Sequence, residues 1–424
     1  MKTAIFVLTV LFLCGSSFGQ TYKVLWSFGG PPNDGANPEG NLVFGKAGNL
    51  YGTTEYGGRA AICAALGCGT AFELSPNSNG SWTESVLYSF CSVFENSLCL
   101  DGVSPSAGLV FDRAGNLYGT TSFGGAGECS YFCGTVFELS PPSTRGGNWS
   151  ETVLYSFCTG SNNFMCEDGV LPLSRLVFDA SGNLYGTTAA GGHSFASDGT
   201  AFELSPSAAG WTHTTLYEFC SKGTPFSCPD GNEPVAGLTF DNSGNLYGTT
   251  QSGGTRAGPG AGSIFELSPG VNGWTERVLL SFTKAEKLQT PTGEVSFDVE
   301  GNLYSTASLG ESGVLRLEPK NQTERTYKFS GQDGYGPRAG VLVGRREKFI
   351  YGTTQQGGAH DYGVVFKIDP SGHETVLYSF CQQANCADGE DPYSGLIEDG
   401  DGNLYGTTMY GGANNAGVVF EITP

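Results

Sequence analysis

Short apolar segments alternate with clusters of glycine, asparagine, aspartate and proline along almost the whole chain of 424 residues. One segment, Gly-Asn-Leu-Tyr-Gly-Thr-Thr at residues 48–54, returns in six further copies, some of them degenerate. The tyrosines of the seven copies are Tyr51, Tyr118, Tyr185, Tyr247, Tyr304, Tyr351 and Tyr405. Self-similarity at intervals of roughly 45 to 70 residues indicates one supersecondary unit used seven times.

Each repeat contains four short β segments separated by turn residues. An apolar segment such as residues 108–112 precedes the heptapeptide, and two β-rich segments such as 69–76 and 86–90 follow it. Four short strands per repeat are typical of a propeller blade. The sequence therefore predicts an all-β, seven-bladed β-propeller of four-stranded blades, with residues 20–424 as a single domain.

The order of the segments predicts how the ring closes. We place the apolar segment innermost, the heptapeptide second, the Phe-Glu-Leu segment third and the Val-Leu-Tyr-Ser-Phe segment outermost. The chain then begins on an outermost strand at residues 23–28 and ends on a third strand, so the N-terminal strand should complete the last blade. We also expect the heptapeptide glycine, such as Gly52, to lie under a side chain from a neighbouring blade.

Residues 1–19 have the layout of a secretory signal peptide. Lys2 precedes an apolar run at residues 4–14, and small residues follow it up to Gly19, the expected last residue of the signal. The apolar run is too short to span a membrane, and no second run follows. We therefore expect a secreted or extracellular protein with no membrane span.

Twelve of the thirteen cysteines follow the expected signal, and they form six close pairs. An even number of cysteines in an exported chain favours disulfides. The expected local bridges are Cys63–Cys68, Cys91–Cys99, Cys129–Cys133, Cys158–Cys166, Cys220–Cys228 and Cys381–Cys386. Zinc binding is the alternative, but the pairs have no neighbouring histidines, and we predict no metal site.

The charge balance limits the kinds of partner that the chain is expected to bind. The chain has 41 acidic and 21 basic residues, which gives a net charge of −20. No basic stripe is present to meet phosphates, which argues against nucleic acid and anionic membranes as partners. The charge favours solubility of an exported protein.

An Asp-Gly-x-x-Pro loop recurs in six repeats. Its aspartates are Asp34, Asp101, Asp168, Asp230, Asp333 and Asp388. A ring of carboxylates could hold a cation such as calcium or meet a basic partner. Aspartate before glycine is also a turn-former that bonds its own backbone, and we favour that structural role.

The Thr-Thr-x-x-Gly-Gly loop after the heptapeptide varies between repeats. In the seventh, first and second repeats its second variable position is Tyr410, Tyr56 and Phe123, and these repeats become neighbours once the ring closes. Such aromatics stack on sugar rings or anchor a protein partner, or else pack beneath their own loops. We take these three residues, with Asp34, Asp101 and Asp388 of the same face, as ligand-binding candidates.

No catalytic residues are predicted. The tryptophans Trp82, Trp149, Trp211 and Trp274 recur just ahead of the outermost strand, which indicates a structural role. The four histidines form no cluster in the sequence, and no motif joins a nucleophile to a base. No cofactor is expected.

The heptapeptide, the Gly-Thr-x-Phe-Glu-Leu-Ser-Pro segment and the Val-Leu-Tyr-Ser-Phe segment together resemble the GloVer tandem repeat, named for Gloeobacter and Verrucomicrobia. The resemblance covers nearly all of the chain after the signal. It implies an exported bacterial repeat protein and supplies no catalytic residues.

Three functions are consistent with these features. The first is a secreted propeller that binds an extracellular glycan or protein through the face with the disulfide-stapled loops. The second is a polysaccharide lyase or glycoside hydrolase that uses carboxylates such as Asp101, Asp168 and Asp388 over the central channel. The third is a structural subunit of an extracellular assembly. The sequence favours the first and does not indicate an oligomeric state.

Overall fold

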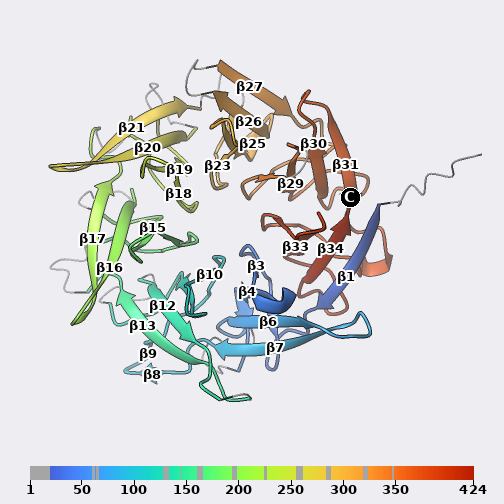
Figure 1. The fold of residues 1–424 in the computed structure, drawn as a ribbon, viewed down its shortest axis with the longest axis horizontal. Helices are drawn as coiled ribbons and strands as arrows, with labels where there is room; N and C mark the ends of the chain where they lie inside the picture. Colours follow the sequence, from blue (N-terminus) through green and yellow to red (C-terminus); the bar gives the residue numbers. More distant parts are fainter. Residues whose placement is uncertain are drawn as a thin grey trace, which may run out of the picture.

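Seven four-stranded antiparallel sheets follow one another around a central axis in the computed structural model (Figure 1). The structure describes residues 20–59, 63, 66–127, 133–144, 146–159, 166–192, 198–223, 227–254, 261–282, 288–318, 323–345 and 348–424. The predicted all-β, seven-bladed propeller is confirmed. The expected signal peptide, residues 1–19, lies outside the described residues.

The strand order within each blade is the predicted one. The innermost strands are β3 (Val43–Phe44), β10 (Val110–Phe111), β14 (Val177–Phe178), β18 (Thr239–Phe240), β23 (Ser296–Phe297), β28 (Leu342–Val343) and β32 (Ile397–Glu398). The second strands, formed by the heptapeptides, are β4 (Leu50–Thr54), β11 (Leu117–Thr121), β15 (Leu184–Thr188), β19 (Leu246–Thr250), β24 (Leu303–Ala307), β29 (Ile350–Thr354) and β33 (Leu404–Thr408). We number the blades 1 to 7 in this order.

The outer half of each blade is longer than the inner half. The third strands are β6 (Thr70–Pro76), β12 (Thr135–Ser140), β16 (Thr200–Ser207), β20 (Ser263–Gly270), β26 (Gly313–Glu318), β30 (Val364–Ile368) and β34 (Val418–Thr423). The outermost strands are β7 (Trp82–Ser89), β13 (Ser150–Ser156), β17 (Gly210–Glu218), β21 (Gly273–Ser281), β27 (Thr323–Lys328), β31 (Glu374–Ser379) and β1 (Thr21–Ser27).

Short elements occupy the connections. Three two-stranded pairs are β2 (Gly35–Ala36) with β5 (Tyr56–Gly57), β8 (Phe94–Glu95) with β9 (Leu98–Cys99), and β22 (Leu288–Gln289) with β25 (Leu309–Gly310). The described residues include the single-turn 3₁₀ helices η1 (Lys46–Gly48) and η3 (Ala384–Cys386). No helix among the described residues is both long and apolar enough to cross a membrane.

The N-terminal strand completes blade 7, as predicted. β1 pairs antiparallel with β34, from Thr21 opposite Thr423 to Ser27 opposite Val418. The two strands lie side by side in Figure 1, one at each end of the colour scale. Closure in this way covers the edge of β34, which would otherwise present unpaired backbone groups.

The heptapeptide glycine packs within its own blade, which corrects our expectation of a neighbouring blade. Gly119 on β11 lies opposite Phe137 on β12. A Cβ at Gly119 would lie only 2.6 Å from Cζ of the buried Phe137 ring and 2.9 Å from a methyl of Leu109, which belongs to the same blade. A large ring needs room across the strand pair, so glycine is required opposite the recurring phenylalanine.

The first threonine of the heptapeptide links one blade to the next. In blade 1 the Thr53 hydroxyl donates to the carbonyl of Ala107 in blade 2 at 2.7 Å. In blade 7 the Thr407 hydroxyl donates to the carbonyl of Pro38 in blade 1 at 3.0 Å. The same link from the second strand to the next blade is made by Thr120, Thr187, Thr249, Thr306 and Thr353.

A second inter-blade contact joins the Gly-Thr start of a third strand to the proline of the next Asp-Gly loop. Gly134 has φ of +89°, and a Cβ there would lie 2.4 Å from Cδ of Pro172. Such a close approach in a left-handed conformation admits only glycine. Equivalent contacts bring Gly69, Gly199, Gly262, Gly363 and Gly417 against Pro105, Pro234, Pro291, Pro392 and Pro38.

The recurring tryptophans also join neighbouring blades, which supports their predicted structural role. Trp149, just ahead of β13, meets Tyr51 of blade 1 edge to face, with the ring centroids 6.3 Å apart. The next blades repeat this contact with Trp211 on Tyr118 and Trp274 on Tyr185. The second and outermost strands are thereby packed into continuous cores between blades.

Candidate functional site

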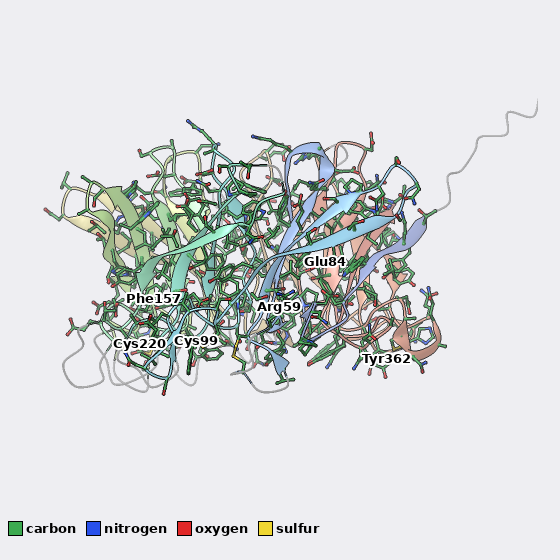
Figure 2. The ribbon with its side chains drawn as sticks, turned by 90° about the horizontal axis from the view of Figure 1, so that it is seen from below. Arg59, Glu84, Cys99, Phe157, Cys220 and Tyr362 are labelled. Carbon is green, nitrogen blue, oxygen red and sulfur yellow. A yellow bond between two sulfur atoms is a disulfide. The ribbon has the colours of Figure 1, made fainter. Side chains whose placement is uncertain are left out.

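The Asp-Gly loops and the Thr-Thr-x-x-Gly-Gly loops lie together on one rim, which we call the loop face. In blade 1 the pairing of β2 with β5 joins the two loops. In blade 2 Val103 bridges Phe123, and in blade 7 Glu390 bridges Tyr410. Figure 2 shows Cys99, Cys220 and Tyr362 along this rim. The shared face expected for the two loop types is therefore present.

The Asp-Gly aspartates are held by their own loops. The buried carboxylate of Asp101 accepts hydrogen bonds from the Tyr88 hydroxyl at 2.7 Å and from the backbone N–H of Ser92 at 2.8 Å. Asp388 likewise accepts from the Tyr378 hydroxyl at 2.7 Å. The tyrosine–aspartate bond recurs in Tyr155–Asp168, Tyr217–Asp230 and Tyr327–Asp333. These contacts tie each loop to the outermost strand, and ligand binding by the aspartates stays a prediction.

Asp34 has the same role where the ring closes. Its two carboxylate oxygens accept from the backbone N–H groups of Gly29 and Gly35, each at 2.6 Å. Burial raises the pKa of Asp34, and the bonds from Gly29 and Gly35 only partly offset that shift.

The three predicted aromatics are all half-buried on the loop face. Two of them come together, because Tyr56 and Tyr410 are close enough to influence each other electrostatically across the junction of blades 1 and 7. Burial raises the pKa of Tyr56 to about 12, and the charge of Glu55 adds to the shift. Phe123 lies in blade 2, where its backbone pairs with Val103.

A cavity of about 270 Å³ lies on the propeller axis. Every blade contributes to its lining through the residues that follow the loop proline. The residue immediately after the proline differs in every blade: Glu39, Ser106, Leu173, Val235, Thr292, Arg338 and Tyr393. None of the Asp-Gly aspartates lines the cavity. The catalytic alternative based on Asp101, Asp168 and Asp388 therefore has no support from the cavity.

Glu39 lines the cavity, and its carboxyl pairs with that of Glu55 in the loop that also supplies Tyr56. Burial raises the pKa of Glu39 to about 8, and repulsion from Glu55 and a hydrogen bond with that carboxyl add to the shift. Burial also raises the pKa of Glu55, and this effect outweighs the hydrogen bonds from Tyr56 and Glu39, which lower it. One proton shared by two carboxyls leaves one group as an acid and the other as a base.

Further acidic groups surround Tyr410. Burial raises its pKa, and the charges of Glu39, Asp391, Glu55 and Glu390 add to the shift. The pKa of Asp391 itself is raised to about 6 by burial and by the neighbouring Glu390. The junction of blades 7 and 1 therefore combines hydroxyl-bearing rings with several carboxyls, a set that suits hydrogen bonding to a polyhydroxylated ligand.

Two residues from other blades complete the wall at blades 6 and 7. The Arg338 guanidinium lies 5.8 Å from the centroid of the Tyr393 ring, a cation–π contact. Nε of Arg338 also donates to the side-chain oxygen of Gln355 at 2.8 Å. These contacts fix the Arg338 head and the Tyr393 ring beside Glu39 and Glu55, which both influence the pKa of Tyr393.

An ion pair crosses the cavity between blades 3 and 5. Nε and Nη2 of Arg175 donate to the two carboxylate oxygens of Glu294 at 3.1 and 2.9 Å. The corresponding positions of blades 2 and 4 are Gly108 and Gly237, where an added Cβ would lie 3.3 and 2.6 Å from these side chains. The bidentate pair spans blade 4 and gives the cavity a polar wall on the side of blades 3 to 5.

Sequence reasoning missed Glu39, Glu55, Arg338 and Tyr393. A signal for three of them was present, because the position after the loop proline is variable in repeats that otherwise agree. That position faces the axis because it leads into the innermost strand, which begins a few residues later. Glu55 occupies the first variable position of the loop that also supplies Tyr56, whereas the predicted ligand-binding residues of this loop come from its second variable position.

Five of the six expected disulfides are formed. They are Cys63–Cys68, Cys91–Cys99, Cys158–Cys166, Cys220–Cys228 and Cys381–Cys386. Cys129 lies outside the described residues, so the sixth pair stays a prediction. The first cysteine of four pairs takes a left-handed conformation, with φ of +59° at Cys91. Its N–H reaches the carbonyl of Gly102 in the Asp-Gly turn at 3.1 Å, which joins the bridge to the loop.

The fold defines a seven-bladed propeller whose loops and axial cavity are the parts that differ between blades. The chain belongs to the Gloeobacter/Verrucomicrobia repeat family, whose model matches residues 10–165, 101–312 and 257–424. This membership confirms the resemblance drawn from the repeated segments. No curated protein matches the chain.

Solved structures share the fold at low identity. A candidate 6-phosphogluconolactonase from Bacteroides fragilis is 15% identical with a TM-score of 0.51, over 86% of this chain and 88% of its own. A puromycin hydrolase mutant is 10% identical with a TM-score of 0.52, over 88% of this chain and 50% of its own. At such identity the likeness extends to the fold alone.

Proposed function

We propose that the protein is a secreted propeller that binds an extracellular glycan at the centre of its loop face. The observation that carries the proposal is the group of Tyr56, Tyr410 and Tyr393 around Glu39 and Glu55, of which Glu39 and Tyr393 line the axial cavity. Aromatic rings offer faces on which sugar rings stack, and carboxyls accept hydrogen bonds from sugar hydroxyls. The disulfides near this face support an oxidising, extracellular setting.

The test is glycan-array screening of the purified protein, followed by calorimetric titration of the best ligand. Replacement of both rings by Tyr56→Ala and Tyr410→Ala should weaken binding about tenfold or more, since each stacked ring contributes roughly 1 kcal/mol. Gln356→Ala is the matched control, because Gln356 is exposed at the cognate position of blade 6. An array without binders, or equal affinities for the double variant and the control, would contradict the proposal.

A second candidate function is glycoside hydrolysis, and the Glu39–Glu55 pair is the observation that favours it. Glycosidases use two carboxyls about 5 Å or more apart, one protonated to serve the leaving oxygen and one ionised, so the hydrogen-bonded pair has to separate around the sugar. Burial and Glu55 raise the pKa of Glu39 to about 8, so Glu39 is the proposed acid and Glu55 its ionised partner.

Release of new reducing ends from the glycans found on the array would test this activity. Glu39→Gln or Glu55→Gln should slow the release of reducing ends by about 100-fold or more, while the glycan still binds. Asp101→Asn provides the comparison, because Asp101 does not line the cavity. If the wild-type protein binds the glycan but releases no reducing ends, the catalytic candidate fails and the binding function stands.

A further inference from the structure

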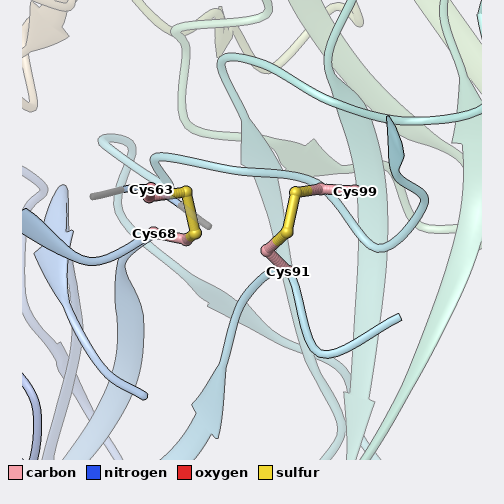
Figure 3. A group of neighbouring side chains, drawn as sticks. All are labelled: Cys63, Cys68, Cys91 and Cys99. Atoms are coloured by element: carbon pink, nitrogen blue, oxygen red, sulfur yellow. A yellow bond between two sulfur atoms is a disulfide. The ribbon is translucent and has the colours of Figure 1, made fainter. Parts of the chain in front are cut away.

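Two disulfides on the loop face bring four sulfur atoms into one cluster. Cys63–Cys68 lies in the loop between β4 and β6 of blade 1, and Cys91–Cys99 lies in the connection to blade 2. The Sγ atoms of all four residues are within 4.8 Å of one another. Figure 3 shows the two bridges facing each other across the gap between their loops.

The cluster is shielded on one side and accessible on the other. Cys68, Cys91 and Cys99 are buried, and the half-buried Val103 packs against them. Cys63 is partly exposed. A small reductant can therefore reach the Cys63–Cys68 bridge first, while the other sulfurs stay in a confined apolar pocket.

The residue just before the Gly-Thr start of the third strand accounts for the cluster. In blade 1 this residue is Cys68, and it adjoins the cysteine pair of the next loop. In blade 2 it is Cys133, which clusters with Cys158 and Cys166. Blades 4 and 7 have alanine there, and no cysteine pair occurs in the loop that follows. Blades 3 and 6 have Asp198 and Tyr362 at this position although a cysteine pair follows, so the clusters of blades 1 and 2 depend on the cysteine at this position.

The arrangement of the four sulfurs matches a tetrahedral thiolate site. Zn–S bonds of about 2.3 Å in a tetrahedron place the sulfurs about 3.8 Å apart. Sulfurs already within 4.8 Å reach this spacing by small side-chain rotations once the two S–S bonds are open. We propose that reduction converts the Cys63, Cys68, Cys91 and Cys99 cluster into a binding site for one soft divalent cation, with zinc as the natural occupant.

The conversion balances in two steps. Each disulfide takes two electrons and two protons from one dithiol reductant, which itself becomes a disulfide, so two reductant molecules give four thiols. Binding of Zn²⁺ then displaces the four thiol protons to solvent and forms four Zn–S bonds. Two covalent links within the loops are thus exchanged for one metal centre that joins blade 1 to the connection leading to blade 2.

The test uses the full chain without its signal, reduced anaerobically with a dithiol until a thiol titration shows complete reduction. Addition of Co²⁺ as a spectroscopic probe should produce thiolate-to-metal absorption and the visible bands of a tetrahedral site, and Zn²⁺ should abolish them. Cys63→Ser should weaken Zn²⁺ retention against a competing chelator by at least tenfold. The oxidised protein should bind neither ion at this cluster.

Stoichiometry identifies the site. Reduced Cys68→Ala, Cys91→Ala protein should hold one equivalent of Zn²⁺ fewer than the wild type. The matched control is Cys381→Ala, Cys386→Ala, which removes a pair from another loop and should leave this equivalent in place. A reduced Cys68→Ala, Cys91→Ala variant that holds as much zinc as the reduced wild type, or a reduced wild type whose Co²⁺ complex has no thiolate absorption, would overturn the proposal. The Co²⁺ absorption measurement uses the wild-type protein, so it tests the proposal even if a variant fails to fold.

Discussion

At the scale of single residues, the outermost strands place a glutamate beside an Asp-Gly aspartate. Burial raises the pKa of Glu84 and of Glu151 to about 8, and repulsion from Asp34 and Asp101 respectively adds to the shift. Oε1 of each glutamate is buried and meets no hydrogen-bond partner among the described residues. With no cation beside it to balance a negative charge, each of these glutamates stays protonated to a higher pH than an exposed glutamate does.

This arrangement predicts a stability that declines as pH rises. The folded-state pKa of Glu84 and Glu151 lies above the unfolded value of about 4.3, so folding binds protons. Their contribution is complete below pH of about 4.3 and is lost as pH rises through about 8. Glu84→Gln with Glu151→Gln should therefore raise the thermal midpoint at pH 9 and flatten its fall between pH 5 and 9.

Calorimetric or fluorescence melts across this pH range provide the measurement. Glu95→Gln is the control, because Glu95 is exposed on β8 and should leave the slope of the wild type unchanged. A double variant whose midpoint falls with pH as steeply as the control would show that these glutamates do not set the dependence.

At the scale of strands and loops, the repeats predicted the fold because they repeat a complete unit of packing. In blade 2 the heptapeptide includes Gly119, which lies opposite Phe137, and Thr120, which links its strand to the next blade. The residues that shape the strand therefore recur with every copy of the heptapeptide. Strand order followed from the phase of the chain. Our prediction that a neighbouring blade covers the heptapeptide glycine was wrong, because sequence spacing does not reveal which adjacent strand provides the covering ring.

The candidate site was only partly predictable. Tyr56 and Tyr410 stood out because they are aromatic in a loop that is otherwise variable, and closure of the ring placed their blades together. Glu39 was hidden in the segment between the Asp-Gly loop and the innermost strand, and its pairing with Glu55 joins two loops of blade 1. Proximity between loops depends on how their backbones turn, and the sequence specifies these turns only at glycine and proline.

At the scale of the whole molecule, blade 7 is the one blade made from both ends of the chain. Tyr22 on β1 stacks on Tyr378 of blade 6 with ring centroids 3.8 Å apart, and its hydroxyl donates to the carbonyl of Asp388. Asn41 of blade 1 accepts from the N–H of Gly395 in blade 7 at 2.6 Å. The closure therefore depends on side chains as well as on the β1–β34 ladder.

Loss of the Tyr22 ring should destabilise the ring as a whole. Tyr22→Ala removes the stack and the hydrogen bond, and we expect the free energy of unfolding to fall by about 3 kcal/mol. Urea titration, followed by tryptophan fluorescence that includes Trp26 on β1, measures the change. Tyr362→Ala is the control, because that ring is 41% exposed on the loop face. Equal midpoints for the two variants would mean that Tyr22 adds nothing to closure.

The pairing of β1 with β34 also sets an order of events during synthesis. Blades 1 to 6 are each built from contiguous chain, whereas Thr21 must wait for Thr423. This contact has nearly the largest sequence separation possible among the described residues, so its loop-closure entropy makes it a late step. The leading strand therefore stays unpaired until β34 has been synthesised, and closure of the ring is the last event of folding.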